Sequence, residues 1–328
     1  MRVRRSLFSA SLVVLAAAVA GCASTPATPA SADADDARSG YPLTLDNCGF
    51  DLSVAGPPQR IVAIKSSTIE LLLSLGVGDR IVAQAFSDGP LPDALRDDAK
   101  GIETLSEKVP SQEATLALEP DMVFAGWESN LTAEGAGDRA ALAELGVASY
   151  VSPAACTGDG YAPAPLTFDS VFDSISEAGR IFDAEEAAAD LVEEQRDQLA
   201  ALTPDDRSLT AVWYSSGRDT PFVGAGTGAP QMIMSAAGLK NIFGDVGDSW
   251  TSASWEAVAA QDPDVIVLVD SAWNTAESKI ELLRSNPLTQ QLTAVRDARF
   301  LVVDFPATEA GVRNVSAVAS LIDQLASS

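Results

Sequence analysis

The sequence predicts an α/β fold with two lobes joined by a long helical segment. Short apolar runs alternate with amphipathic stretches from Arg60 onward, the alternation stops between Thr167 and Leu202, and it resumes after Pro204. Strands that alternate with helices in this way are typical of a parallel sheet covered by helices. With 328 residues and 47% hydrophobic content, the chain can fill two cores of medium size.

The first lobe is expected over residues 41–165. Its expected strands are Ile61–Ile64, Ile81–Ala83, Met122–Ala125 and Ala148–Val151, with helices over Thr68–Leu75 and Asp138–Leu145. The strands are runs of aliphatic and β-branched residues, which indicates that they are buried.

A helical connector is expected over residues 166–204. Apolar residues recur there at helical spacing, from Phe168 through Ile175 to Leu199. The segment Phe182–Glu186 interrupts this pattern, and Asp183 is expected to cap a second helix whose first turn is acidic.

The second lobe is expected over residues 205–328, where the alternation returns. Its expected strands are Leu209–Tyr214, Val265–Val269 and Phe300–Val303, with helices over Gln231–Ala237, Ala276–Leu283 and Asn314–Ala326.

An internal repeat links the two lobes. The motif Ser-x-Glu-Ala begins at Ser111 and again at Ser254, and a Pro-Asp dipeptide follows at the same spacing in both copies, just before a strand. In each copy the serine can cap a short helix that the Pro-Asp ends. The repeat favours two lobes of common architecture over a chance similarity.

The N-terminus is typical of an exported lipoprotein. The basic segment Met1–Arg5 precedes an apolar run, Leu7 to Ala20, that is short for a membrane span. The run leads into Val19-Ala20-Gly21-Cys22, which is similar to the lipobox of bacterial lipoproteins. Residues 1–22 are therefore expected to be a signal peptide ending in a lipidated Cys22, with a plain secretory signal as the alternative. Residues 23–40 have little to bury and are expected to form a flexible tether.

Cys48 and Cys156 are the two other cysteines of the chain. Disulfides persist outside the cytoplasm, so these two are expected to pair. Two free thiols remain the alternative, because a bridge needs Cα atoms within about 7 Å of each other.

The charge balance and the absence of histidine exclude several classes of function. The chain has 21 basic and 46 acidic residues, a net charge of −25, which argues against nucleic acid or anionic lipid as a partner. Without histidine, Ser-His-Asp and Cys-His catalysis and histidine metal sites are ruled out. We therefore expect a binding protein that is not an enzyme and holds no metal or cofactor.

The loops after the expected strands carry the candidate ligand contacts. Ligands bind beyond the carboxyl ends of strands in open α/β sheets, and three of the five tryptophans fall there. Such loops suit a flat, partly polar organic ligand, although packing at a domain edge is the commoner role of one tryptophan. The candidate ligand-binding residues are Lys65, Ser66, Ser67, Phe86, Trp127, Glu128, Trp213, Tyr214, Trp273, Asn274, Thr308 and Arg313. Of these, Lys65 and Arg313 are candidate partners for a ligand carboxylate or phosphate, with surface ion pairs as the alternative.

Several motifs together resemble a known family. They are the lipobox, Arg60-Ile61-Val62 before Ser66-Ser67-Thr68, Leu118-Glu119-Pro120-Asp121, one helical connector, and Asp262-Pro263-Asp264. The chain, over about residues 41–328, resembles the substrate-binding proteins of iron-siderophore, haem and cobalamin ABC importers. The resemblance implies the class III periplasmic-binding-protein fold, two Rossmann-like lobes joined by a rigid helix with the ligand in the cleft between them. It also implies a monomer, lipid-anchored on the extracytoplasmic face of the cell membrane, that serves an ABC permease dimer and its ATPase.

The family resemblance extends to docking and to a ligand. In the family a glutamate on each lobe docks onto the permease, and the matching residues are Glu113 and Glu256. The alternative, with equal weight, is that both are first-turn acids favoured by the helix dipole. Within the family, the chain is similar to an actinobacterial branch described as carriers of a deazaflavin precursor of coenzyme Factor 420. The supporting stretches are Tyr41–Gly49, Ala125–Asn130, Gly228–Met234 and Phe305–Asn314.

The sequence leaves three classes of function in competition. A ligand carrier for an importer is the first, with a deazaflavin precursor as ligand or, alternatively, an iron-siderophore, haem or cobalamin. A ligand-sensing partner of a membrane receptor and a carboxylate-dependent surface enzyme are the others.

Overall fold

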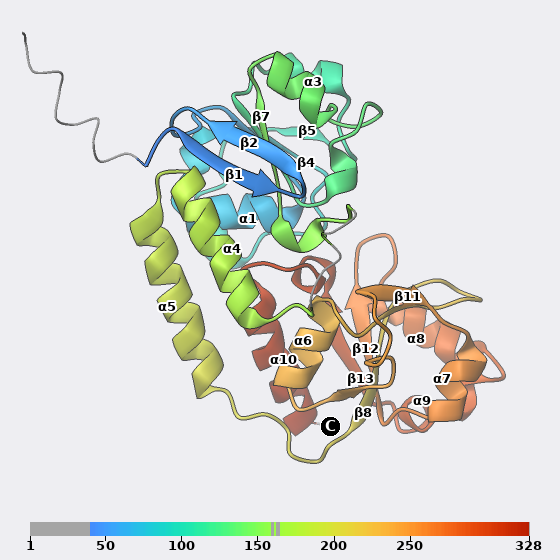
Figure 1. Cartoon of the computed structure of the whole chain (residues 1–328). Coiled ribbons are helices and arrows are strands. Elements are labelled where there is room, and N and C mark those ends of the chain that lie inside the picture. Colours follow the sequence, from blue (N-terminus) through green and yellow to red (C-terminus); the bar gives the residue numbers. More distant parts are fainter. Residues whose placement is uncertain (1–39, 159–160, 162–164, 328) are drawn as a thin grey trace, which may run out of the picture. The chain divides into compact units, whose positions relative to one another are not determined.

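The computed structural model describes residues 40–158, 161 and 165–327 (Figure 1). The expected signal peptide, its Cys22 and most of the expected tether lie outside these residues. No helix of the described part of the chain is long and apolar enough to cross a membrane.

A five-stranded parallel sheet forms the centre of the first lobe (Figure 1). In spatial order its strands are β5 (Thr104–Ser106), β4 (Ile81–Ala85), β3 (Ile61–Ile64), β6 (Met122–Ala125) and β7 (Ala148–Val151), with helices α1 (Ser66–Ser74), α2 (Gln112–Leu116) and α3 (Arg139–Glu144). The predicted bounds of β3, β6 and β7 are confirmed, and β4 continues two residues beyond its expected end.

Both faces of this sheet are buried. In β3, Ile61 and Ala63 belong to a core that includes residues of α1, whereas Val62 and Ile64 pack in a second core with Leu142 of α3. A strand covered on both faces has no solvent-facing positions, which explains the uninterrupted apolar runs of the sequence.

A β-hairpin that was not expected from the sequence precedes this sheet. Strands β1 (Leu43–Asn47) and β2 (Phe50–Val54) pair antiparallel in a separate two-stranded sheet. The two-residue turn, Cys48 and Gly49, has positive φ at both positions, as hairpin turns of this length require.

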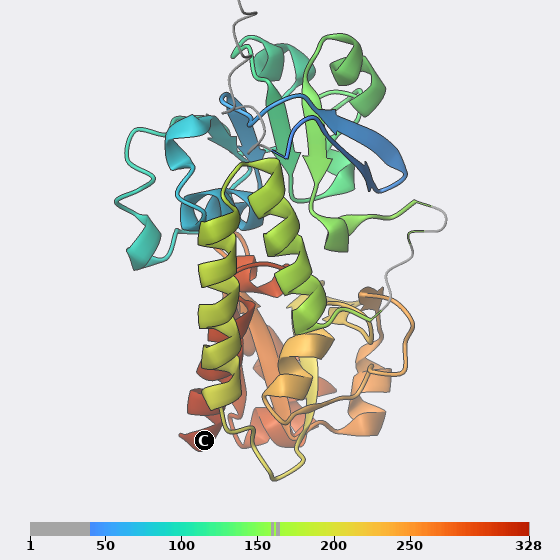
Figure 2. The same ribbon diagram turned by 60° about the vertical axis from the view of Figure 1, so that its left-hand side comes forward.

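The connector consists of two helices, α4 (Phe168–Ile181) and α5 (Glu185–Ala201), which lie side by side (Figures 1 and 2). This corrects the single rigid helix that the resemblance implied. The predicted interruption is confirmed, but the predicted cap is wrong: Ala184 is the N-cap of α5, and Asp183 adopts a left-handed φ of 54°. Gly179 lets the helices approach, because a Cβ there would lie 2.5 Å from the Cβ of Ala188.

A six-stranded sheet forms the centre of the second lobe (Figure 1). Its strands follow the order β11 (Trp250–Ser252), β9 (Phe222–Gly224), β8 (Thr210–Ser216), β12 (Val265–Asp270) and β13 (Phe300–Asp304), with β10 (Lys240–Asn241) beside β8. Its helices are α6 (Ala229–Ala236), α7 (Trp255–Gln261), α8 (Ala276–Ser285), α9 (Thr293–Arg296) and α10 (Asn314–Ala326). Strands β8, β10, β12 and β13 are parallel, and the short strands β9 and β11 were not expected from the sequence.

One hydrophobic core runs through both lobes. It contains Ala63 of the first sheet, Phe172 and Ile175 of α4, Val267 of the second sheet and Val318 of α10. The connector thus packs against both sheets, and Ser39–Ser328 form a single compact unit. The division points at residues 165 and 204 stay a prediction.

The internal repeat has the same geometry in both lobes, as predicted. Ser111 and Ser254 each cap a helix, α2 and α7, by accepting a hydrogen bond from the backbone N–H three residues later. Asp121 and Asp264 then accept hydrogen bonds from backbone N–H groups just before β3 and at the start of β8. Each Pro-Asp aspartate therefore fixes the start of the neighbouring strand.

Candidate functional site

The candidate site lies between the lobes, where loops at the carboxyl ends of β3, β4 and β6 meet the segment Phe305–Arg313, which follows β13. Lys65, Phe86 and Trp127 come from the first lobe, and Phe305 and Glu309 come from the second. A hydrogen bond, a cation–ring contact and an ion pair join the two lobes here. This is the position at which open α/β sheets bind ligands.

Lys65 occupies the centre of this site. Its side chain is fully buried, and its ammonium forms an ion pair with Asp88, which is also buried. The backbone of Lys65 has a φ of 86°, an unusual conformation for a residue with a side chain and a feature that clusters at functional sites. The chain makes room for it with Gly126, because a Cβ there would lie 2.6 Å from the Cβ of Lys65.

Aromatic rings surround the Lys65 ammonium. The Nζ atom lies 3.5 Å from the ring centroid of Trp127, 4.4 Å from that of Phe86 and 5.2 Å from that of Phe305. Ring faces attract a cation, so this arrangement supplements the ion pair with Asp88. Burial lowers the pKa of Lys65 and raises that of Asp88, and the attraction between the two charges opposes both shifts.

The lobes are joined near this cation by a hydrogen bond. The indole Nε1–H of Trp127 donates to Oε2 of Glu309 over 2.9 Å. Burial raises the pKa of the Glu309 carboxyl, opposed by the charge of Lys65 and by this hydrogen bond.

A buried ion pair also joins the lobes. Arg313, at the start of α10, donates from Nε to Oε2 of Glu70 in α1 over 2.7 Å and from a terminal nitrogen to the other carboxylate oxygen over 2.5 Å. A third hydrogen bond from Arg313 reaches the carbonyl of Pro90. The Glu70 side chain is 1% exposed, and its burial raises its pKa, whereas Arg313 lowers it. Lys65 and Arg313 are therefore both neutralised by carboxylates of the chain itself.

Two small cavities lie beside these contacts. The first, called the inter-lobe cavity below, has a volume of about 60 Å³ and is lined by Ser67, Gly126, Ser152, Ala154, Ala155, Leu166, Thr227, Gly228, Ala229, Ser249, Trp250, Thr308, Glu309 and Ala310. The second, against α4, has a volume of about 30 Å³. Pockets for organic ligands measure roughly 300–1,000 Å³, so such a ligand requires the lobes to separate here.

A larger groove of about 460 Å³ lies elsewhere, between β2 and the residues that lead into β7. Its lining includes Pro58 and Asp121, which precede β3 and β6. The groove is thus at the amino ends of the strands, away from the position where this fold class binds ligands.

The structure brings seven of the predicted ligand-binding residues to the contacts between the lobes. They are Lys65, Ser66, Ser67, Phe86, Trp127, Thr308 and Arg313. Ser66 supports the ion pair, since its hydroxyl accepts from the backbone N–H of Asp88 over 2.8 Å. The hydroxyl of Thr308 donates to the Phe305 carbonyl. Contact of these residues with a ligand stays a prediction.

Three predicted residues have other roles in the structure. Trp213 and Tyr214 are 0% and 1% exposed, because each packs in a hydrophobic core, and the structure does not place them at the contacts between the lobes. The reason is that β8 continues to Ser216, two residues beyond its expected end. Glu128 accepts hydrogen bonds from the backbone and hydroxyl of Thr157, which ties two loops of the first lobe together.

Trp273 and Asn274 lie on a loop after β12. The Trp273 side chain is 64% exposed and packs edge-on against Phe305, a ring of the Lys65 surroundings. Lys279 of α8, which is 1% exposed, holds this loop by donating to the carbonyls of Val269 and Asn274. Trp273 thus presents an open ring face at the edge of the site.

Lys279 is expected to make stability depend on pH. Burial lowers its pKa from 10.5 to about 8. Between these values the unfolded chain binds more protons, so the free energy of unfolding should rise with pH by about 1 kcal/mol per unit relative to Lys279→Met, which lacks the ammonium. Urea denaturation of both proteins at pH 8, 9 and 10 measures this, and a constant difference would contradict the lowered pKa of Lys279.

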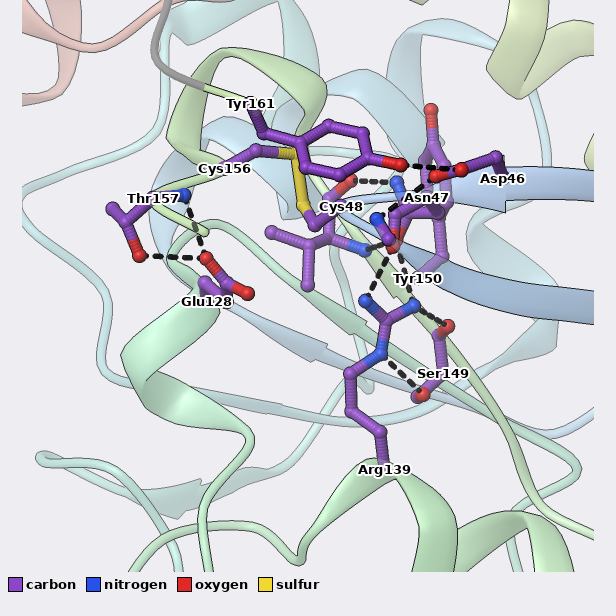
Figure 3. Close-up of a disulfide and its surroundings, with 12 residues drawn as sticks. Asp46, Asn47, Cys48, Glu128, Arg139, Ser149, Tyr150, Cys156, Thr157 and Tyr161 are labelled. Atoms are coloured by element: carbon purple, nitrogen blue, oxygen red, sulfur yellow. Dashed lines mark hydrogen bonds between the residues drawn. A yellow bond between two sulfur atoms is a disulfide. The ribbon is translucent and has the colours of Figure 1, made fainter. Parts of the chain in front are cut away.

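The predicted disulfide between Cys48 and Cys156 is present, with Cα atoms 5.1 Å apart (Figure 3). It joins the turn of the β1–β2 hairpin to the loop after β7. Beside it, Arg139 donates to the carbonyl and side-chain oxygens of Asn47 and to Ser149 (Figure 3). The hairpin is therefore held to the sheet by a covalent bond and a buried hydrogen-bond network.

Sequence reasoning missed several residues of the site. Asp88, Phe305 and Glu309 lie in loops that the sequence indicated, but they were not chosen as ligand contacts, and Glu70 lies inside a helix. The presence of Lys65 and Arg313 was a signal that carboxylates lie nearby, because a buried cation requires an anionic partner. Among the described residues, no three or more histidine, cysteine, aspartate or glutamate side chains are grouped so that they could hold a metal ion.

Glu113 and Glu256 occupy equivalent positions in the first turns of α2 and α7. Both side chains are exposed, and neither has an ion-pair partner among the described residues. They are available to a partner, and their docking role stays a prediction.

Comparisons with known proteins agree with this architecture. The family model described as "Periplasmic binding protein" matches residues 61–307. The uncharacterized ABC transporter substrate-binding lipoprotein YvrC of Bacillus subtilis is 24% identical, covering 98% of this chain and 97% of YvrC. A cobalamin-binding protein of Halobacterium salinarum is 29% identical over 90% of this chain and 78% of its own length. A crystal structure from Saccharomonospora viridis, described as an ABC-type Fe3+-hydroxamate transport system, is similar with a TM-score of 0.74 and 27% identity, covering 87% of this chain and 99% of that chain. The predicted fold class is thereby confirmed.

Proposed function

Because the chain belongs to the periplasmic binding protein family, we propose that it is the solute-binding component of an ABC importer that captures an organic ligand between its lobes for a permease. The observation that carries this proposal is the meeting of Lys65, Trp127 and Glu309 between the lobes. The family and the named relatives consist of binding proteins. A carrier releases its ligand unchanged, whereas a surface enzyme would convert it. A ligand-sensing partner of a membrane receptor is the other alternative.

The ligand proposed first is a deazaflavin precursor of coenzyme Factor 420. The resemblance of the sequence to that branch supports it, and the rings of Trp127, Phe86 and Trp273 offer faces for a flat ring system. Cobalamin and ferric siderophores are the second choice, supported by the names of two relatives. Haem is included with them because the sequence resemblance extends to haem importers.

The test is a thermal-shift titration of the full chain, purified in a mild detergent, against each of these ligands. A ligand present at 100 times its Kd should stabilise the protein by about 2.7 kcal/mol and be recovered unchanged. A folded protein that none of them stabilises would contradict the proposed ligands, and a ligand recovered in altered form would contradict the carrier function.

We also propose that Cys22, which lies outside the described residues, anchors the chain on the extracytoplasmic face of the membrane. The similarity to a lipoprotein along 98% of the chain supports this anchor. Cys22→Ser should move the protein from the membrane fraction to the soluble fraction of its host, since the acyl chains supply the membrane affinity. Continued membrane association of the variant would contradict lipidation at this residue.

Glu113 and Glu256 are proposed to dock a monomer of the chain onto the permease dimer. Their equivalent, exposed positions on the two lobes support this role. With the importer in proteoliposomes, Glu113→Ala with Glu256→Ala should lower ligand-dependent ATPase activity by at least tenfold. Ligand affinity should be unchanged, because neither residue lines the inter-lobe cavity. Unchanged ATPase activity would contradict docking through these glutamates.

A further inference from the structure

The charges between the lobes do not balance. Lys65 is paired with Asp88 and Arg313 with Glu70, and all four side chains are at most 12% exposed. Glu309 is a fifth charged side chain of the site, and none of the ion pairs between described residues includes it. These five side chains therefore have one carboxylate in excess, whereas the sequence made Lys65 and Arg313 candidate partners for a ligand carboxylate or phosphate.

Glu309 also depends on a hydrogen bond that ligand entry must break. Among the described residues, Trp127 is the only side chain that donates to its carboxylate. Glu309 belongs to the second lobe and Trp127 to the first, and Glu309 lines the inter-lobe cavity. A ligand that separates the lobes here takes Trp127 away from Glu309, and a half-buried carboxylate that loses its donor is destabilised.

A ligand can replace the lost donor only with a donor of its own. An ionised carboxylate accepts hydrogen bonds and cannot donate them, so a ligand amide or imide N–H satisfies Glu309 and a ligand carboxylate does not. A ligand anion is also disfavoured at the two cations, because it has to displace Asp88 or Glu70 and leave a buried carboxylate unpaired.

We propose that the cleft selects an organic ligand that presents amide or imide N–H groups to Glu309, and disfavours one that presents carboxylates there. This inference rests on the proposed carrier function and specifies its substrate class. The imide edge of a deazaflavin ring and the amide side chains of a corrin have this chemistry, whereas the peripheral acids of haem do not. An anionic tail, where a ligand has one, then points out of the cleft.

Two matched pairs of probes test the proposal. Dicyanocobinamide carries amides where dicyanocobyrinic acid carries carboxylates on the same corrin ring, and 5-deazariboflavin has the imide N–H that its N3-methyl derivative lacks. Isothermal titration of the full chain in detergent measures the Kd of each probe. In at least one pair, the ratio of the Kd of the second member to that of the first should be ten or more. The variant Glu309→Gln, whose amide can both donate and accept, should reduce this ratio at least fivefold. Glu281→Gln, which removes an exposed carboxylate on α8, is the matched control and should leave the ratio as in the wild type.

Each outcome decides between the inference and the function on which it rests. Equal or tighter binding of the carboxylate or N-methyl members, or the same ratio in Glu309→Gln as in the wild type, would overturn the inference and leave the carrier function in place. A folded chain that binds none of the four probes would contradict the corrin and deazaflavin ligands and the inference with them.

Discussion

Replacing Arg313 with methionine is expected to lower the free energy of unfolding by about 3–5 kcal/mol, because it leaves a buried carboxylate without its partner. Glu70 is 1% exposed, and both of its oxygens accept hydrogen bonds from Arg313. The substitution also removes the bond to the carbonyl of Pro90. Urea denaturation of the full chain at neutral pH measures the effect.

The control for this prediction is the double variant Glu70→Gln with Arg313→Met. A neutral glutamine has a smaller desolvation cost than a carboxylate, so the double variant should regain at least half of the lost stability. A single variant within about 1 kcal/mol of the wild type would show that the pair is solvated, as surface ion pairs are. That result would contradict the buried contact between the lobes.

Replacing both Cys48 and Cys156 with serine is expected to lower the free energy of unfolding by about 2–5 kcal/mol. The bridge spans a sequence separation of 108 residues, so its loss frees a long loop in the unfolded chain. It also releases the β1–β2 hairpin, whose turn contains Cys48. Chemical denaturation with and without a reducing agent measures the change.

The wild type serves as its own control in this experiment. Reduction should lower the stability of the wild type to near that of the double serine variant and leave the variant unchanged. Equal stability of the oxidised wild type and the variant would contradict a bridge that supports the fold.

The regular part of the fold could be predicted from the sequence because its strands are buried on both faces. Strands such as β3 and β12 are uninterrupted apolar runs, and helices of the expected length separate them. The hairpin β1–β2 was missed because the expected strands were uninterrupted apolar runs, whereas its apolar and polar residues alternate, the pattern of a strand exposed on one face. Strand β10, with two residues, has no readable periodicity.

The loops of the site could be predicted, but the pairing of side chains within them could not. The rule that ligands bind at the carboxyl ends of strands indicates the loops of Lys65 and Trp127. Glu70 and Arg313, however, are 243 residues apart, and only the packing of the lobes brings them together. The charge of the site therefore follows from tertiary structure, and it changes the expected chemistry of the ligand from an anion to a hydrogen-bond donor.

The central claim, that an organic ligand binds between the lobes, is tested most directly by a tryptophan-fluorescence titration of the full chain in mild detergent with dicyanocobinamide and 5-deazariboflavin. We expect saturable quenching by at least one of them, weakened at least tenfold in Trp127→Ala, which removes the ring proposed to stack on the ligand, and retained in Trp255→Phe, whose ring lies in the core of the second lobe. No saturable quenching by either probe, or the same affinity in Trp127→Ala as in the wild type, would contradict ligand binding at this site.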